Sequence, residues 1–553
     1  MSRTAEPGAR DGRKARAAAW VGAGIFLSRV SGFLRESVFA YYFGVSAVAD
    51  VWRAALRTPY VIQNLLGEGT LSASLIPVYA EFLEEGREED AGRFAGAALG
   101  ILTVVAFSLA LLGMLLAPLL IRVFFFEWEP WMQELGVRIV RILFPMTAVL
   151  VVSAWALGIL NSHRRFFVSY VAPVAWNLTM VATLVGFGTF LGWEQAGRDP
   201  ELVVALAWGA LAGGVLQLLV QLPWVGAVLR HFRLSLGRGV RGVREGIRNF
   251  LPVVAARGVV NLSSWLDMVL AGMLAVGAQA LLGFAQTLYL LPISLFGMSI
   301  AASELPELSR NRRAARDVLA PRIREALDRL AFLLLPSALA YLVLGDIFIA
   351  ALFQRGAFDP TDTTVTHIVL ATYALGLPAS ASSRALSSGF YALRDTRTPA
   401  RIATGRVALS VGLGAALMFP LDRFTVGDLH LGAAGLALGS AAGAWVEYVF
   451  LRRSLTSHLG SHGPGWRRPA RMLLAGLTAA GAGWGARTVL GFSGGAGVLP
   501  EVLGSGSFWV NPLSAVATAG AFGVTYLVVA AILGVGMPLR RPGERRDGTG
   551  KGR

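Results

Sequence analysis

The sequence contains no cysteine, only six histidines and only 15% charged residues. Without cysteine the chain cannot form a disulfide bond, an iron–sulfur cluster or a thiolate zinc site. The histidines do not follow the HExxH spacing of zinc hydrolases, so no metal site is expected. Lysine is rare as well: of the 50 lysine and arginine residues, only Lys14 and Lys551 are lysines.

Hydrophobic residues dominate instead, at 55% of the 553 residues with a mean hydropathy of +0.58. Long apolar runs alternate with short polar loops, which indicates an all-α polytopic membrane protein. About fourteen runs approach the ~20 residues that a helix needs to cross a bilayer. We expect these transmembrane helices at residues 17–43, 50–82, 92–120, 133–160, 166–192, 201–229, 248–275, 279–304, 327–353, 364–392, 400–420, 431–453, 470–491 and 512–536.

The formal net charge is +16, and the distribution of the basic residues among the loops indicates the orientation of these helices. Arginines gather in the loops after the even-numbered helices, and basic loops stay on the cytoplasmic side of a membrane. We therefore expect both termini in the cytoplasm, and we do not expect nucleic acid as a partner. The first apolar run is expected to stay in place as a helix rather than to be cleaved as a signal peptide.

An internal repeat of about 230 residues is indicated by two pairs of similar segments. Residues 74–77 (SLIP) resemble residues 303–306 (SELP), and residues 158–161 (GILN) resemble residues 389–392 (GFYA). Six helices fit in each copy, which predicts two lobes related by an axis along the membrane normal. The predicted organisation is a basic tail at 1–16, an N-lobe at 17–229, a basic linker at 230–247, a C-lobe at 248–453, two further helices at 470–536 and a basic tail at 537–553.

The stretch from Ser28 to Glu68 carries many charges for a segment inside a bilayer, where each costs about 2.5–3.5 kcal/mol. Such charges persist only if they face water, one another or a ligand. The second predicted helix places four of these charges and one amide on one face: Asp50, Arg53, Arg57, Glu68 and the amide Asn64. The first predicted helix adds Arg29, Arg35 and Glu36. The pattern predicts a polar stripe facing a cavity, with possible bends of the second helix at Pro59, Gly67 and Gly69.

Several motifs occur in a fixed order along the chain. They are residues 28–36 (SRVSGFLRE), 68–69 (EG), 77–81 (PVYAE), 141–145 (RILFP), 158–163 (GILNSH), 353–358 (FQRGAF) and 390–399 (FYALRDTRTP). As an ordered set they resemble the MurJ/MviN lipid II flippases of the multidrug/oligosaccharidyl-lipid/polysaccharide exporter superfamily. The resemblance covers nearly the whole chain.

The resemblance implies that lipid II, or a similar polyprenyl-pyrophosphate glycolipid, crosses the bacterial cytoplasmic membrane from the inner to the outer leaflet. It also implies a cationic cavity between two lobes, a tail groove near the last two helices, and membrane lipids and the cell-wall synthesis machinery as partners. Guanidinium groups suit a pyrophosphate because they stay charged and bind two oxygens at once. The expected substrate-binding residues are Arg29, Arg35, Arg53, Arg57, Gln63, Asn64 and Thr287, and the expected gating or protonation residues are Glu36, Asp50 and Glu68.

Two sets of alternatives stay open at this point. The arginines could pair internally instead: Arg29 or Arg35 with Glu36, Arg53 with Asp50, and Arg57 with Glu68. Asp267 with Asn261 and Ser263 forms an oxygen-rich set that could bind Na⁺ or H⁺ as a coupling ion, or could be a buried carboxyl bonded to hydroxyls and Arg257.

The predicted mechanism is alternating access of two rocking lobes, and no organic cofactor is expected. The chain has no Walker A pattern and no acidic catalytic constellation, so we do not expect an enzyme. Gln63 and Thr287 stand where the family usually has arginine. These replacements keep two alternatives open: an exporter of another lipid-linked or anionic glycan, and a non-transporting scaffold of envelope assembly with the same fold.

Overall fold

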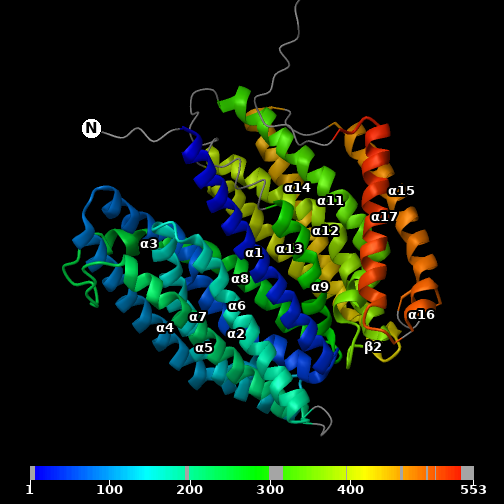
Figure 1. Cartoon of the computed structure of the whole chain (residues 1–553), viewed down its shortest axis with the longest axis horizontal. Helices are drawn as coiled ribbons and strands as arrows, with labels where there is room; N and C mark the ends of the chain where they lie inside the picture. The colour runs from blue at the N-terminus through cyan, green and yellow to red at the C-terminus, as the bar shows by residue number, and fades with distance from the viewer. Residues whose placement is uncertain are drawn as a thin grey trace, which may run out of the picture. The chain divides into compact units, whose positions relative to one another are not determined.

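The structure is a computed structural model that describes residues 7–193, 198–297, 315–393, 395–460, 465–492, 496–504 and 506–536. The described residues are almost entirely helical (Figure 1). The second copy of the repeat motif at 303–306 and the basic tail at 537–553 lie outside them. The chain divides into two compact units, and each is described by itself below. The predicted lobes at 17–229 and 248–453 stay a prediction.

Unit 1 comprises Met1–Phe284, Leu352–Thr366 and Val411–Leu436. Its helices follow one another along the chain: α1 (Pro7–Phe43), α2 (Ala47–Leu66), α3 (Glu68–Glu84), α4 (Glu88–Phe124), α5 (Pro130–Ser162), α6 (Phe166–Leu184), the π-helix η1 (Val185–Phe190), α7 (Asp199–Val228), α8 (Val243–Ala271) and the start of α9 (Ala278–Pro292). A small antiparallel hairpin of β1 (Thr425–Val426) and β2 (Leu429–His430) also belongs to this unit.

Unit 2 comprises Ala285–Ala351, His367–Ser410 and Ala437–Arg553. It holds the rest of α9 and most or all of the following elements: η2 (Ile293–Gly297), α11 (Ala315–Phe353), α12 (Pro360–Ala392), α13 (Arg397–Asp422), α14 (Gly432–Leu459), α15 (Arg467–Leu490), α16 (Val498–Leu503) and α17 (Val510–Ile532). In Figure 1, α15 and α17 run side by side in orange and red. The ion pairs Arg468–Asp328 (3.2 Å) and Arg487–Asp346 join α15 to α11.

The predicted membrane spans coincide with these helices. By length and composition, ten helices among the described residues can cross a membrane. The remaining predicted spans fall on α1, on α2 with α3, on α8 and on α15. The structure therefore confirms an all-α polytopic membrane fold, and the count of about fourteen spans agrees with it.

The second predicted span is interrupted, as expected, at Gly67. Helix α2 ends at Leu66 and α3 begins at Glu68. The Gly67 N–H still bonds the Gln63 carbonyl at 2.7 Å, and a Cβ on Gly67 would lie 2.3 Å from that oxygen. Only glycine allows the backbone so close an approach. Asn64 and Glu68 therefore do not continue one straight polar stripe.

Helix α5 forms the centre of unit 1. Helices α2, α3, α4 and α7 all contact it (Figure 1). Its apolar stretch is largely buried. Two buried hydroxyl and amide groups bridge α5 to α7, since Ser153 and Gln221 bond at 3.0 Å. Helix α5 packs on α2, and α6 packs on α1, so these two contacts position the helices that carry the charged residues.

Candidate functional site

The carboxylate of Glu36 on α1 binds two arginines. Its Oε1 accepts from Arg35 Nη2 at 2.7 Å, and its Oε2 accepts from Arg53 Nη2 at 2.6 Å. The three side chains are only 19%, 9% and 10% exposed for Arg35, Glu36 and Arg53 respectively. Two guanidinium groups on one carboxylate leave the cluster with a net positive charge. We call Arg35, Glu36 and Arg53 the arginine–glutamate cluster.

Two residues of α6 also contact the Arg35 guanidinium. Arg35 Nη1 donates to Asn177 Oδ1 at 3.0 Å, and the guanidinium lies 5.0 Å from the centre of the Trp176 ring. Asn177 Nδ2 donates in turn to Ser31 Oγ at 2.9 Å, back on α1. This fixes both ends of the amide, so Asn177 orients Arg35 toward Glu36.

Arg53 lies between two aromatic rings. Its guanidinium is 5.0 Å from the centre of Phe39 and 4.7 Å from that of Phe284. A Cβ on Gly283 would lie 2.7 Å from Arg53 Nε, so the glycine makes room for the guanidinium. Desolvated cation–π contacts of this kind contribute about 2 kcal/mol. Arg53 is thus enclosed on both faces and paired at its end.

Asp50 is bound by the backbone of α9 rather than by an arginine. Its Oδ2 accepts from Gly277 N at 2.6 Å, and its Oδ1 accepts from Ala280 N at 2.7 Å. The carboxyl group is buried and caps the N-terminus of α9, where unpaired N–H groups and the helix dipole favour a negative charge. The considered pairing of Arg53 with Asp50 is therefore wrong, because Arg53 binds Glu36.

Asp50→Asn and Asp50→Ala separate this capping contact from a role in proton transfer. Asparagine caps helices about as well as aspartate, so Asp50→Asn should retain most stability and transport. Asp50→Ala leaves two buried N–H groups without an acceptor and should lose about 2–4 kcal/mol. Thermal unfolding in detergent and transport assays check both variants. Loss of transport in a stable Asp50→Asn protein would instead support the predicted protonation.

The other predicted residues are more dispersed. On unit 1, Arg29 and Asn64 are exposed, whereas Arg57, Gln63 and Asp267 are half-buried. On unit 2, Thr287 is half-buried in α9. The side chains of Glu68, Asn261, Ser263 and Arg257 lie outside the described residues, although their backbones belong to α3 and α8. The described residues hold no group of three His, Asp or Glu side chains suited to a metal ion.

The pairing of Arg35 with Glu36, one of the alternatives that the sequence left open, is confirmed, but sequence reasoning did not identify the other partners of these charges. Asn177, Trp176, Phe39 and Phe284 come from helices far apart in sequence and look like ordinary membrane residues. An intramembrane asparagine is a usable signal for Asn177, because such an amide needs a partner in lipid. The aromatic residues give no comparable signal.

Unit 2 contains a separate basic cluster. Arg406 Nη1 donates to Glu447 Oε2 at 2.7 Å between α13 and α14. Arg384 on α12 is exposed and lies within electrostatic reach of both these groups. Tyr289 stacks on Tyr373 with ring centres 5.2 Å apart. Arg384 and Arg406 against one carboxylate give this cluster a net positive charge too.

One motif of the ordered set proves to be a helix cap. Asp395 Oδ1 accepts from the backbone N–H groups of Arg397 and Thr398, both at 3.0 Å, at the start of α13. The hydrogen bonds from Thr398 and the Arg397 backbone lower the pKa of the Asp395 carboxyl below its usual range. Residues 395–399 thus fix where the helix begins.

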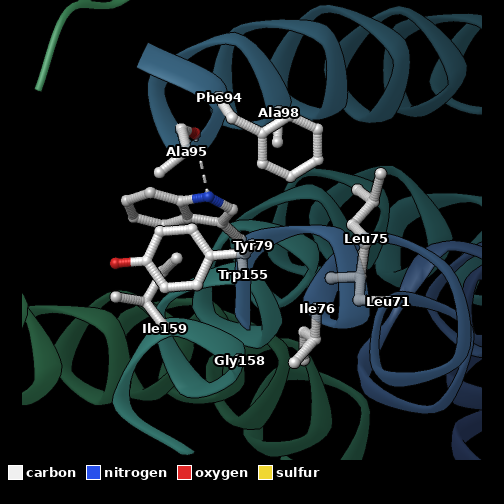
Figure 2. Close-up of a pocket in the computed structure, with 10 residues that line it drawn as sticks. All are labelled: Leu71, Leu75, Ile76, Tyr79, Phe94, Ala95, Ala98, Trp155, Gly158 and Ile159. Carbon is white, nitrogen blue, oxygen red and sulfur yellow. Dashed lines mark hydrogen bonds between the residues drawn. The ribbon is translucent and has the colours of Figure 1, made fainter. Parts of the chain in front are cut away.

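Two cavities of unit 1 are apolar. One of about 20 Å³ lies between α3, α4 and α5, where Figure 2 shows the Trp155 indole N–H directed at the Ala95 carbonyl at 3.1 Å. A second of about 50 Å³ adds Val243, Ile247 and Phe250 from α8. Neither cavity is lined by a charged side chain, so neither suits a pyrophosphate.

The family model described as lipid II flippase MurJ matches residues 39–500. The chain belongs to the lipid II flippase MurJ family. It is a transporter by family and not an enzyme. The MurJ family match begins just after the arginine–glutamate cluster residue Glu36 and includes Arg53 and Asp50.

Curated MurJ proteins and solved structures agree with this membership. The chain is 32% identical over 440 residues to a probable lipid II flippase MurJ of Rhizobium tropici, covering 78% of this chain and 79% of the relative. It is 32% identical over 471 residues to the lipid II flippase MurJ of Burkholderia cenocepacia, covering 82% and 87%. A solved MurJ structure in an inward closed conformation matches with a TM-score of 0.73 at 20% identity, over 93% of this chain and 98% of that one.

A wider structural likeness reaches the superfamily. An inward-facing multidrug resistance MATE family transporter of the MOP superfamily matches with a TM-score of 0.60 at 17% identity, over 78% of this chain and 95% of that one. At this identity the likeness concerns the fold alone. It agrees with the exporter superfamily expected from the ordered motifs.

Proposed function

We propose that this chain carries lipid II from the inner to the outer leaflet of the bacterial cytoplasmic membrane by alternating access. The match to the lipid II flippase MurJ family over residues 39–500 supports this proposal most directly. The multi-pass helical fold agrees with it. The arginine-rich loops that follow even-numbered helices support cytoplasmic N- and C-termini. The cell-wall synthesis machinery would take up the precursor on the outer side.

The pyrophosphate head is proposed to bind first at the arginines that the structure leaves outside the arginine–glutamate cluster. Arg29 is exposed on α1, and Arg57 is half-buried on α2, one turn beyond Arg53. Arg35 and Arg53 are held by Glu36 and supply the positive field behind them. A pyrophosphate gains charge-assisted hydrogen bonds from guanidinium groups at both positions.

The other predicted residues take supporting roles in the same proposal. Gln63, Asn64 and Thr287 would offer neutral hydrogen bonds to the sugar or phosphate in place of arginine. Glu68 remains a proposed gating residue, and Asp267 with Asn261 and Ser263 a proposed site for Na⁺ or H⁺. Inside-negative potential favours outward movement of an anionic head by about 2.3 kcal/mol per charge per 100 mV.

Complementation of a bacterium depleted of its own lipid II flippase tests this function. We expect the unchanged chain to restore growth, and Arg29→Ala and Arg57→Ala each to reduce flipping about tenfold or more, because each removes charged hydrogen bonds to the head. Arg93→Ala is the matched control, since Arg93 is an exposed arginine of α4 that pairs with Glu89. Protein levels are compared by immunoblot.

Failure of a well-expressed chain to restore growth would contradict lipid II as the substrate. Binding of the purified protein to other polyprenyl-pyrophosphate sugars would then test export of a different glycan. Equal growth with Arg29→Ala, Arg57→Ala and Arg93→Ala would contradict the proposed head-binding site while leaving the transport function intact.

A further inference from the structure

The connection between α7 and α8 lies along the surface of α4. Residues 229–242 contain no helix or strand, and we call them the strap. The strap begins where α7 ends at Val228 and leads into α8 at Val243. Most of the predicted basic linker at 230–247 therefore belongs to an ordered, non-helical segment.

Three glycines of α4 allow the strap backbone to lie directly on the helix. A Cβ at Gly92 would be 2.1 Å from the Arg230 carbonyl oxygen, and one at Gly96 would be 2.0 Å from that of Arg233. A Cβ at Gly100 would be 2.1 Å from the Ser235 oxygen. The glycines are four residues apart and share one helix face. Their Cα–H groups face the strap carbonyls, a close approach of the kind that glycine permits.

Contact of the strap backbone with α4 leaves several apolar side chains of the strap exposed. Phe232, Leu234 and Leu236 are 40%, 66% and 63% exposed, and they occupy alternate positions of the strap. Arginines interleave with them or follow them, all exposed: Arg230, Arg233, Arg238 and Arg241, with Arg244 and Arg248 in the first turns of α8. The strap therefore exposes both arginines and apolar side chains, and its backbone is held in place against α4.

The acidic groups near the strap do not neutralise it. Arg230 approaches Glu88 only to 3.7 Å and Arg241 approaches Asp90 only to 3.9 Å, and both arginines are at the surface. Asp90 is already bound by Arg87 at 2.8 Å. Exposed pairs of this kind contribute little. In the same turn of α4, Glu89 pairs with Arg93, and Glu245 lies in the first turn of α8 beside the six arginines.

We propose that the strap is an interfacial anchor that binds anionic phospholipid headgroups at the bilayer surface. The arginines attract the phosphate groups, while Phe232, Leu234 and Leu236 enter the boundary between headgroups and acyl chains. The bilayer is the expected occupant because the strap follows α7 and lies on the first turns of α4, and both helices are long and apolar enough to cross a membrane. A soluble phosphate or an acidic protein would account for the arginines but not for the exposed apolar residues.

The missing cysteines make a direct test possible. Leu236→Cys gives a single thiol for an environment-sensitive fluorophore in the full-length protein. The labelled protein is placed in vesicles of phosphatidylcholine and phosphatidylglycerol, with a spin-label quencher on the acyl chain of one lipid or the other. Glu127→Cys, in the arginine-poor connection at the other end of α4, is the matched control.

We expect the phosphatidylglycerol quencher to act more strongly than the phosphatidylcholine quencher at position 236, and equally at position 127. Each arginine near an anionic surface raises lipid affinity about fivefold. The variant R230Q/R233Q/R238Q/R241Q should therefore lose the preference while its apolar residues and the glycine contacts remain. Since these arginines are outside the proposed head-binding site, the result is independent of transport.

Three results would overturn the anchor. Equal quenching by the two lipids at position 236 would exclude selective anionic lipid binding. Strong quenching by aqueous iodide, at the level seen at position 127, would place the strap in water and favour a soluble partner. A lipid preference that persists in the quadruple variant would show that the arginines do not cause it.

Discussion

Glu36→Ala is expected to lower the free energy of unfolding by about 3–5 kcal/mol, the range for breaking a buried ion pair by removing one partner. The loss is large because Arg35 and Arg53 both bind the Glu36 carboxylate, and both are mostly buried. Asn177 and the aromatic rings can orient the two guanidinium groups but cannot neutralise them. Thermal unfolding in detergent, followed by tryptophan fluorescence, measures the change.

Two further variants make the result specific. Glu85→Ala removes an exposed partner of Arg87 and should change stability by less than about 1 kcal/mol. Adding Arg53→Met to Glu36→Ala should recover part of the loss, because the second variant removes one of the uncompensated charges. If Glu36→Ala is no less stable than Glu85→Ala, the cluster does not stabilise the fold.

The helices could be predicted from the sequence because each follows from a local property. Apolar runs of membrane length mark the spans, and arginine-rich loops separate them. The interruption at Gly67 was also predictable, since glycine is a frequent point of helix bending. These features depend on residues close together in the chain, which is why the structure confirms the fold class so closely.

The partners of the charges could not be predicted in the same way. Asp50 and Arg53 are three residues apart on one helix, which favours a local pair. In the structure, Asp50 instead accepts hydrogen bonds from the N–H groups of Gly277 and Ala280, about 230 residues later. Arg53 forms its ion pair with Glu36 on the preceding helix. An N-terminus of a helix competes with arginine for a carboxylate, and only the tertiary arrangement decides between them.

The candidate site is affected by this difference. The sequence analysis left both a ligand role and an internal ion pair open for the four arginines of α1 and α2. Arg35 and Arg53 share the carboxylate of Glu36, whereas Arg29 and Arg57 lie outside this cluster. A paired arginine can position the site and add to its field, whereas a substrate must displace Glu36 to bind it directly. This gives Arg29 and Arg57 the larger expected effect on transport.

Gly96→Ala is expected to release the strap from α4. The added Cβ would lie 2.0 Å from the Arg233 carbonyl oxygen, closer than real contacts allow, and the atom that must move is backbone. Overpacking of this kind costs about 1–3 kcal/mol. The strap should therefore open about tenfold more often. Since it contains Arg230, Arg233, Arg238 and Arg241, trypsin should cut it about tenfold faster, and the two fragments report the cut by mass.

Gly226→Ala is the control for this experiment. Gly226 lies in the last turn of α7, next to the strap, and a Cβ there meets nothing within 4 Å. Alanine should stabilise this helix by about 0.5–1 kcal/mol and leave the rate of cutting unchanged or lower. Gly92→Ala and Gly100→Ala should resemble Gly96→Ala, because each meets a strap carbonyl at a similar distance. Equal cutting of Gly96→Ala and Gly226→Ala would mean that the glycines do not hold the strap, and that its arginines reach the membrane surface without a fixed backbone behind them.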